Sequence, residues 1–338
     1  MKKLNQKGIT LVALVITIIV LMILAGISLS FVLGDNGILK KAQETADAYK
    51  NASQSEQQTL QNIENYLYSE NVGDKIQKTK SYVGYYADIE GDGIIDGVIY
   101  ADKAVGGSGS WEETIGSTDY AASYTIPKVT EGLKDYSISQ ESYTGKFGTK
   151  AVISPTGTGE ERFYIMALTD IDGKTNGTTY CWYYAADSTK IKDYATVTST
   201  GFGTGKTNTA NMIEKWNKPA YGDQDACPES KGGHKDMWGQ IQEQASKPAP
   251  VSKGWFVPSK EEWAAFVGEL GISSNESNEK YYGKLGLSSS YWSSSLCSSD
   301  KWGVQACYVT CSEYSEYKVI LTHFYIDNCF SVRLSATF

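Results

Sequence analysis

The sequence predicts an α+β protein in which a long N-terminal helix, hydrophobic at first and amphipathic afterwards, precedes a mixed domain. Three observations support this prediction. Residues 9–32 carry no charge, apolar side chains then recur at helical spacing as far as Leu67, and from Tyr82 short β-prone pieces alternate with glycine-bearing turns. A chain of 338 residues has room for an anchor and one large domain, since domains commonly hold roughly 100–200 residues.

The apolar run at 9–33 is long enough to span a membrane, because about 20 apolar residues match the hydrocarbon core of a bilayer. Lys2, Lys3 and Lys7 precede it, and a positive flank favours a cytoplasmic N-terminus. A secretory signal has a shorter apolar region of about 7–15 residues. We therefore expect a single-pass anchor in the cell membrane, with the C-terminal domain outside the cell.

The junction between Gly8 and Ile9 joins a short basic leader, residues 1–8, directly to the apolar run. This junction resembles the prepilin-type signal of type IV pilins. The resemblance implies cleavage by a prepilin peptidase after Gly8, and packing of the apolar helix with other pilin-like subunits in a surface filament. The fifth residue after the cut is Ala13, where major pilins carry the glutamate that registers subunits. A minor pilin-like subunit and a simple membrane-tethered protein both fit.

Residues 34–75 are expected to form an amphipathic stalk helix between the anchor and a domain at 76–338. Asp35 or Asn36 could cap its start. Its apolar positions follow three- and four-residue spacing and are Leu39, Ala42, Ala46, Tyr49, Leu60, Ile63 and Leu67.

Composition and charge exclude several functions. The net charge of −8 argues against a nucleic-acid partner, which needs a basic face for phosphate contacts. The histidines are His234 and His323 alone, which leaves little material for a histidine metal site or for acid–base catalysis. No Gly-x-Ser-x-Gly nucleophile motif occurs, so we expect no enzymatic activity.

Residues 201–207 end like a phosphate-binding loop but lack its first glycine. The motif requires glycine five positions before Gly205, where Thr200 stands. We predict instead a loop that enters a helix over 208–216.

One loop has the carboxylate spacing of a calcium site. Asp88, Glu90, Asp92 and Asp96 occupy positions 1, 3, 5 and 9 of an EF-hand-like loop, with glycine at position 6. Position 12 is Ile99, so the bidentate glutamate is missing. Either a structural Ca²⁺ ion or a solvated Asp/Gly turn is expected.

The most informative pattern lies in the last third of the chain. Residues 254–266 predict a strand, a turn and a helix in which Ser259 and Glu262 form a capping box. Two further pieces, Tyr-Trp-Ser-Ser-Ser at 291–295 and Ser-Val-Arg-Leu at 331–334, predict core strands.

Together these motifs resemble the C-type-lectin-like fold of the formylglycine-generating-enzyme branch, in which a P-[ST]-x-x-E-W helix, a YWSSS strand and a VRL strand recur. The resemblance covers roughly residues 76–338. Enzymatic members use a particular cysteine pair for oxidation chemistry, and the sequence does not place such a pair here. Their activity is therefore not carried over.

The segment between these motifs has an unusual composition. It is dense in tyrosine, and it shows neither metal-ligand spacing nor a strand or helix period. It also holds four of the six cysteines: Cys297, Cys307, Cys311 and Cys329.

Residues 296–331 resemble the variable region of proteins diversified by retroelements, on a C-type-lectin-like domain. The resemblance implies that adenine-directed mutagenesis randomises codons, often AAC, to Cys, Tyr, Ser, His, Asp and others, but never to Trp, Lys, Glu, Gln or Met. Two or three ordinary strands with cysteines placed by chance are the alternative. Fixed or differently templated codons are expected at Lys301, Trp302, Gln305, Glu313, Glu316 and Lys318.

A diversified region implies a variable ligand, a protein or another cell-surface molecule, bound by adaptable side chains such as tyrosine and serine. Trp292, Trp302 and Arg333 are expected to belong to the scaffold. The expected contact residues are Cys297, Ser298, Asp300, Gly303, Cys307, Tyr308, Thr310, Cys311, Tyr314, Tyr317, His323, Tyr325, Asp327 and Asn328.

Three functions follow from these patterns. The leading hypothesis is a surface binding protein with a diversified site. The alternatives are a minor pilin-like filament component with an invariant C-terminal domain and, less favoured, an enzyme of the formylglycine-generating type.

Overall fold

The structure, a computed structural model, divides into two compact units, Met1–Gly73 and Asp74–Phe338. It describes residues 14–25, 41, 45, 75–115, 118–174, 178–183, 198–218, 236–244, 254–272, 283–300, 303–311 and 319–338. The predicted α+β class is confirmed, with an N-terminal helix in the first unit and mixed sheets with helices in the second.

In the first unit, the predicted N-terminal helix is present over residues 14–25. Its large apolar side chains between Leu14 and Leu24 are 46–63% exposed. Among the described residues, no helix combines the length and the apolar character needed to cross a bilayer. The leader, the Gly8–Ile9 junction and the predicted stalk, apart from residues 41, 45 and 75, lie outside the described residues.

The second unit mixes short strands with three described helices. Its helices are α3 (Gly205–Trp216), α4 (Met237–Gln244) and α5 (Lys260–Glu269). Its strands are β1 (Tyr86–Ala87), β2 (Gly97–Asp102), β3 (Gly107–Ile115), β4 (Thr118–Ile126), β5 (Tyr136–Gly145), β6 (Gly148–Pro155), β7 (Phe163–Ala167), β8 (Tyr180–Cys181), β9 (Ser290–Asp300), β10 (Gly303–Cys311), β11 (Val319–Tyr325), β12 (Cys329–Phe330) and β13 (Ser335–Thr337).

Within the described residues these strands form four sheets. The largest has the order β13-β7-β2-β1-β6-β5, in which only β1 and β6 run parallel. An antiparallel sheet has the order β11-β10-β9, and two-stranded ladders join β12 to β8 and β3 to β4.

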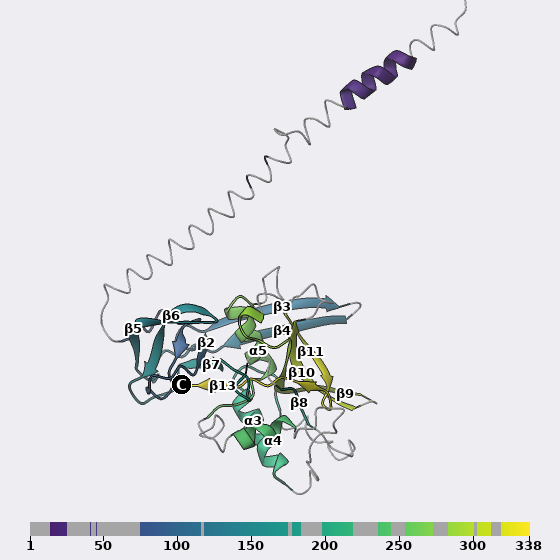
Figure 1. The fold of residues 1–338 in the computed structure, drawn as a ribbon. Helices are drawn as coiled ribbons and strands as arrows, with labels where there is room; N and C mark the ends of the chain where they lie inside the picture. Colours follow the sequence, from purple (N-terminus) through teal and green to yellow (C-terminus); the bar gives the residue numbers. More distant parts are fainter. Residues whose placement is uncertain are drawn as a thin grey trace, which may run out of the picture. The chain divides into compact units, whose positions relative to one another are not determined.

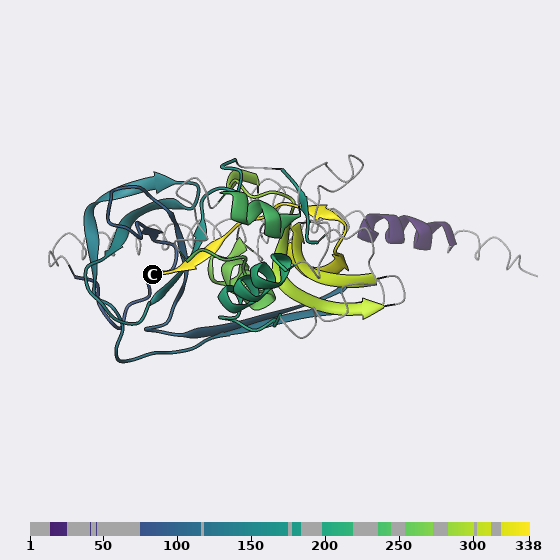
Figure 2. The same cartoon turned by 90° about the horizontal axis from the view of Figure 1, so that it is seen from below.

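The second unit begins and ends at the same place. The Ile76 amide donates to the Tyr136 carbonyl at the start of β5, 3.3 Å away, and the ring of the last residue, Phe338, lies 5.5 Å from the Tyr136 ring. Figures 1 and 2 both place β5 and β6 at one end of the unit and β9, β10 and β11 at the other. The sheet that carries the predicted contact residues is therefore remote from the point where the chain enters the unit.

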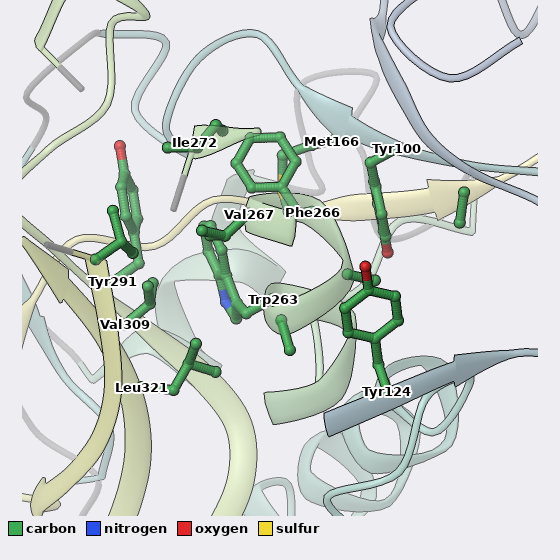
Figure 3. Packing of buried hydrophobic residues seen from close by; sticks show 14 of the residues in the cluster. Tyr100, Tyr124, Met166, Trp263, Phe266, Val267, Ile272, Tyr291, Val309 and Leu321 are labelled. Carbon is green, nitrogen blue, oxygen red and sulfur yellow. The ribbon is translucent and has the colours of Figure 1, made fainter. Parts of the chain in front are cut away.

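The core between these ends is built around α5. Trp263 is fully buried and its ring stacks on Tyr291 of β9, with centroids 5.1 Å apart, while Phe266 faces the Tyr100 ring of β2. Figure 3 shows Trp263 between Tyr291 and Val309 on one side and Phe266 on the other. Burying aromatic side chains of this size is a large source of stability. Helix α5 thus joins the two larger sheets.

The predicted capping box of α5 is confirmed. The Ser259 hydroxyl accepts the Glu262 amide, and the Glu262 carboxylate accepts the Ser259 amide in return. The helix predicted over 208–216 is also confirmed, but α3 begins earlier, at Gly205, so the end of the predicted loop belongs to the helix.

Two predicted strands near α5 are shorter than expected. Before α5 only Phe256 pairs, in a single bridge to Ser335. The next amide, Val257, donates to the Thr209 hydroxyl instead, and Pro258 has no amide hydrogen. At the C-terminus, β13 begins only at Ser335, and the residues before it are held by single bonds in which the carbonyls of Val332 and Leu334 accept the amides of Ile171 and Ala167.

The absence of a strand period over 296–330 was misleading, because the segment contains the last part of β9, from Leu296, and the whole of β10 and β11. Two register shifts beside Ala306 interrupt the pairing of β10 with β9. Bulges of this kind break the two-residue alternation by which a strand is recognised.

Candidate ligand-binding face

The β9-β10-β11 sheet has two different faces. Tyr291, Val309 and Leu321 point to the core, where they join the cluster around Trp263. Because successive strand residues point to opposite faces, the neighbouring residues Trp292 and Tyr308 lie on the other side. The register pairs Tyr308 with both Trp292 and Thr322 across the three strands.

This second face carries a cluster of aromatic rings, here called the aromatic face: Trp292, Tyr308, Phe324 and Phe330. Tyr308 and Phe330 stack with centroids 4.4 Å apart and planes at 17°. Trp292 lies 4.5 Å from Phe330, and Phe324 lies 6.3 Å from Tyr308. Burial decreases across the cluster, from Trp292 at 0% exposed to Phe324 at 41%. The cluster is therefore anchored in the core and open to solvent at β11.

The register gathers many of the predicted contact residues at one end of this sheet. Gln305 pairs with Ser298 on β9 and with Tyr325 on β11, so both predicted contacts flank it in one row. Gly303 pairs with Asp300 at the same end. The Ile326 amide donates to the Val304 carbonyl, 3.2 Å away, which holds the turn containing Asp327 and Asn328 beside this row.

The predicted contact residues differ in exposure. Cys297, His323 and Asp327 are exposed, and Gly303, Tyr308, Tyr325 and Asn328 are half-buried. Ser298, Asp300 and Cys311 are placed on their strands by the backbone. Tyr314 and Tyr317 lie outside the described residues.

Two of the predicted contacts need correction. Cys307 is 0% exposed and Thr310 is 8% exposed. The Thr310 hydroxyl shares a hydrogen bond with that of Ser290 and donates to the Ser289 carbonyl. A side chain held inside the sheet does not meet a ligand in this conformation, so Cys307 and Thr310 are not ligand contacts.

The cysteine pairing that the sequence left open is partly resolved. Cys297 on β9 and Cys307 on β10 form a disulfide. It crosses the two strands beside the register shifts and fixes this irregular part of the sheet. Cys297 is thus both an exposed residue and a structural one.

Sequence reasoning missed Phe324 and Phe330. Phe324 has the most exposed side chain of the aromatic face, and it pairs with Ala306 on β10. Both phenylalanines belong to the amino-acid set that randomised AAC codons yield. That criterion could have included them, whereas the emphasis on tyrosine and cysteine passed over them.

The predicted calcium loop folds around its own backbone. One Asp88 oxygen accepts the amides of Gly91 and Asp92, at 2.7 and 3.2 Å, and the other accepts the Gly93 amide at 2.9 Å. Asp96 accepts the Ile89 amide at 2.7 Å. These bonds satisfy the backbone amides of Ile89, Gly91, Asp92 and Gly93 in the turn.

Burial raises the pKa of Asp96, and the Asp88, Asp92 and Glu90 charges raise it further, while the Ile89 amide opposes the change. A cation would relieve this repulsion. Among the described residues, no group of three or more His, Cys, Asp or Glu side chains is arranged to hold a metal. Calcium binding by Asp88, Glu90, Asp92 and Asp96 stays a prediction.

Comparison with protein-family models finds no match, and comparisons with curated proteins and with solved structures find no significant match.

Proposed function

We propose that this chain is a surface-displayed ligand-binding protein whose C-terminal contact face is diversified by retroelement mutagenesis. It combines a pilin-like membrane anchor with a C-type-lectin-like domain. The observation that carries the proposal is that the β9-β10-β11 sheet is packed against the core in one part and exposed in another. The centre of one face packs on α5. Exposed residues of the 296–331 region lie on the aromatic face and at the end of the sheet where Gln305 pairs with Ser298 and Tyr325, and these two parts are together called the candidate face.

The lectin-like part of the proposal is supported by where three distant motifs meet. Trp263 of the P-S-K-E-E-W motif stacks on Tyr291 of the YWSSS motif and donates its indole hydrogen to the Trp292 carbonyl, 3.2 Å away. Arg333 of the VRL motif lies over the Tyr291 ring, 5.4 Å from its centroid. The residues on which the resemblance rests thus form one packed cluster beneath the candidate face.

The surface location is supported by two features. The Cys297–Cys307 disulfide fits an oxidising compartment, because disulfides persist mainly outside the cytoplasm. The 14–25 helix carries apolar side chains on every side, and in a single chain these side chains are exposed. A helix of this kind is normally covered by lipid or by other helices.

Deep sequencing of this gene in a population grown from one cell tests the proposal. We expect substitutions at adenine-templated codons for exposed positions such as His323, Phe324 and Asp327. The codons of the core residues Val309 and Leu321 should be spared, and codons 254–270 of the same gene serve as an invariant control. A near-copy of the region and a reverse-transcriptase gene should lie in the flanking locus.

The outcomes separate the hypotheses. If codons 296–331 are as invariant as the control codons and no near-copy exists, the diversified binder is overturned. If sheared surface fibres contain the chain and substitution of Gly8 abolishes both processing and assembly, the filament component replaces it. Substitutions spread equally over core and exposed codons would contradict the face assigned here.

A further inference from the structure

A second pair of cysteines lies outside the candidate face. Cys181 on β8 and Cys329 on β12 are directly opposite in an antiparallel ladder, and their Sγ atoms are 3.2 Å apart. Opposed residues in such a ladder have Cα atoms about 4.5–5.5 Å apart. This spacing falls within the range of roughly 4.4–6.8 Å that a disulfide spans.

From this geometry we propose that Cys181 and Cys329 form a second structural disulfide in the mature protein. It closes a loop with a sequence separation of 148 residues, which encloses the Cys297–Cys307 bridge. The inference does not depend on the proposed ligand-binding function, since it rests on the β8–β12 pairing alone.

The accessibility of the two thiols determines the order of the reaction. Cys181 is buried, whereas Cys329 is partly exposed. The Cys329 thiolate can therefore attack a disulfide oxidant such as oxidised glutathione, forming a mixed disulfide and releasing one glutathione thiolate. The Cys181 thiolate then attacks Cys329 Sγ and displaces the second glutathione. Two protein thiols are oxidised, one glutathione disulfide is reduced to two thiols, and the two protons of the cysteines pass to the released glutathiones.

The bridge would fix the end of the predicted variable segment to the scaffold. The β8–β12 ladder is only two residues long, and a short ladder is a weak tether by itself. Phe330 follows Cys329 and stacks on Tyr308, and the Tyr183 amide beyond Cys181 donates to the Ile326 carbonyl, 3.1 Å away. The disulfide therefore holds both the aromatic face and the 325–328 turn in place, and it assigns Cys329 a scaffold role.

Peptide mapping of the full-length protein tests the proposal. The protein is purified in detergent, equilibrated with oxidised glutathione, alkylated under denaturing conditions and digested with trypsin without reduction. Cleavage after lysine and arginine places Cys181 in peptide 175–190 and Cys329 in peptide 319–333. We expect these two peptides as one linked species that separates on reduction.

The Cys297–Cys307 bridge is the internal control, because it links peptide 285–301 to peptide 302–318. C181S and C329S should each lose the 175–190/319–333 species, while C311S should retain it. In C181S the partly exposed Cys329 should instead carry glutathione, because the thiol that displaces the glutathione is missing. If the control bridge has formed and Cys181 and Cys329 in the wild-type protein are each alkylated or carry glutathione, the proposal is overturned. A linkage of Cys329 to any cysteine other than Cys181 also overturns it.

Discussion

The Arg333 guanidinium lies 2.8 Å from an Asp170 carboxylate oxygen at a point where both side chains are almost completely buried. Arg333 also donates to the Gly286 carbonyl at 2.7 Å, and Asp170 accepts the hydroxyls of Tyr291 and Ser288. The pair thus connects the segment before β13, the loop after β7 and the start of β9. It braces the strand that begins the candidate face.

Replacement of Arg333 by methionine should reduce the free energy of unfolding by about 3–5 kcal/mol, because it leaves the Asp170 charge buried without its partner. Urea unfolding followed by tryptophan fluorescence measures the change. The matched control is K218M, which removes the exposed pair between Lys218 and Glu214 and should cost less than about 1 kcal/mol. Equal effects of the two substitutions would contradict a structural role for the buried pair.

Glu262 should make stability depend on pH. Burial raises the pKa of Glu262 from 4.5 to about 7, although the amides of Ser259, Gly205 and Gly203 oppose the change. Between these two values the folded protein retains a proton that the unfolded chain has released, so the free energy of unfolding falls as pH rises and levels off above about 7.

The expected loss over this range is about 3 kcal/mol, from 1.36 kcal/mol for each pKa unit. E262Q keeps a neutral side chain and should remove this part of the slope, which urea unfolding at a series of pH values would measure. E214Q, which changes an exposed carboxylate on α3, should leave the slope in place. Parallel curves for E262Q and the wild type would show that Glu262 does not titrate as described.

Asp88 should stabilise its loop whether or not calcium is present. D88A removes the acceptor of three backbone hydrogen bonds and should lower the free energy of unfolding by about 1.5–3 kcal/mol, the range for a bond to a charged group. E141A, at an exposed position outside the loop, is the control. A D88A protein as stable as E141A would contradict this role.

Urea unfolding, which measures the stability of D88A and E141A, also tests calcium binding. If the loop takes up Ca²⁺, the ion should raise the unfolding midpoint of the wild type above its value in EGTA, and it should do so less for D92N. A midpoint that calcium leaves unchanged would remove the calcium prediction while retaining the hydrogen-bonding role of Asp88.

Residues at the two ends of the aromatic face should contribute very different amounts to the free energy of unfolding. F324S changes a side chain that is 41% exposed and should cost less than about 1 kcal/mol, whereas W292A, at the buried end, should cost about 3–5 kcal/mol. Thermal unfolding of both variants measures the difference. A large loss in F324S would mean that Phe324 is part of the core and not a contact residue.

The candidate face was predicted only in part. The region 296–331 and many of its exposed members could be found from residue types, because cysteine- and tyrosine-rich composition is visible without a structure. The burial of Cys307 and Thr310 could not, since it depends on the residues opposite them, with Cys307 paired with His323 and Thr310 paired with Ser290. A shift of one residue exchanges the two faces of a strand, and no local pattern indicates where it occurs.

Features that depend on neighbours within a few positions could be read directly from the sequence. The capping box of Ser259 and Glu262, the helix predicted over 208–216 and the apolar helix at 14–25 belong to this class, because each is governed by contacts within one or two helical turns. Contacts between distant segments depended on the fold. Cys181 meets Cys329 across 148 residues, and Asp170 meets Arg333 across 163. Such pairs form only when the order and register of the strands bring the two segments together. The spacing of residues along the chain does not indicate that order or register.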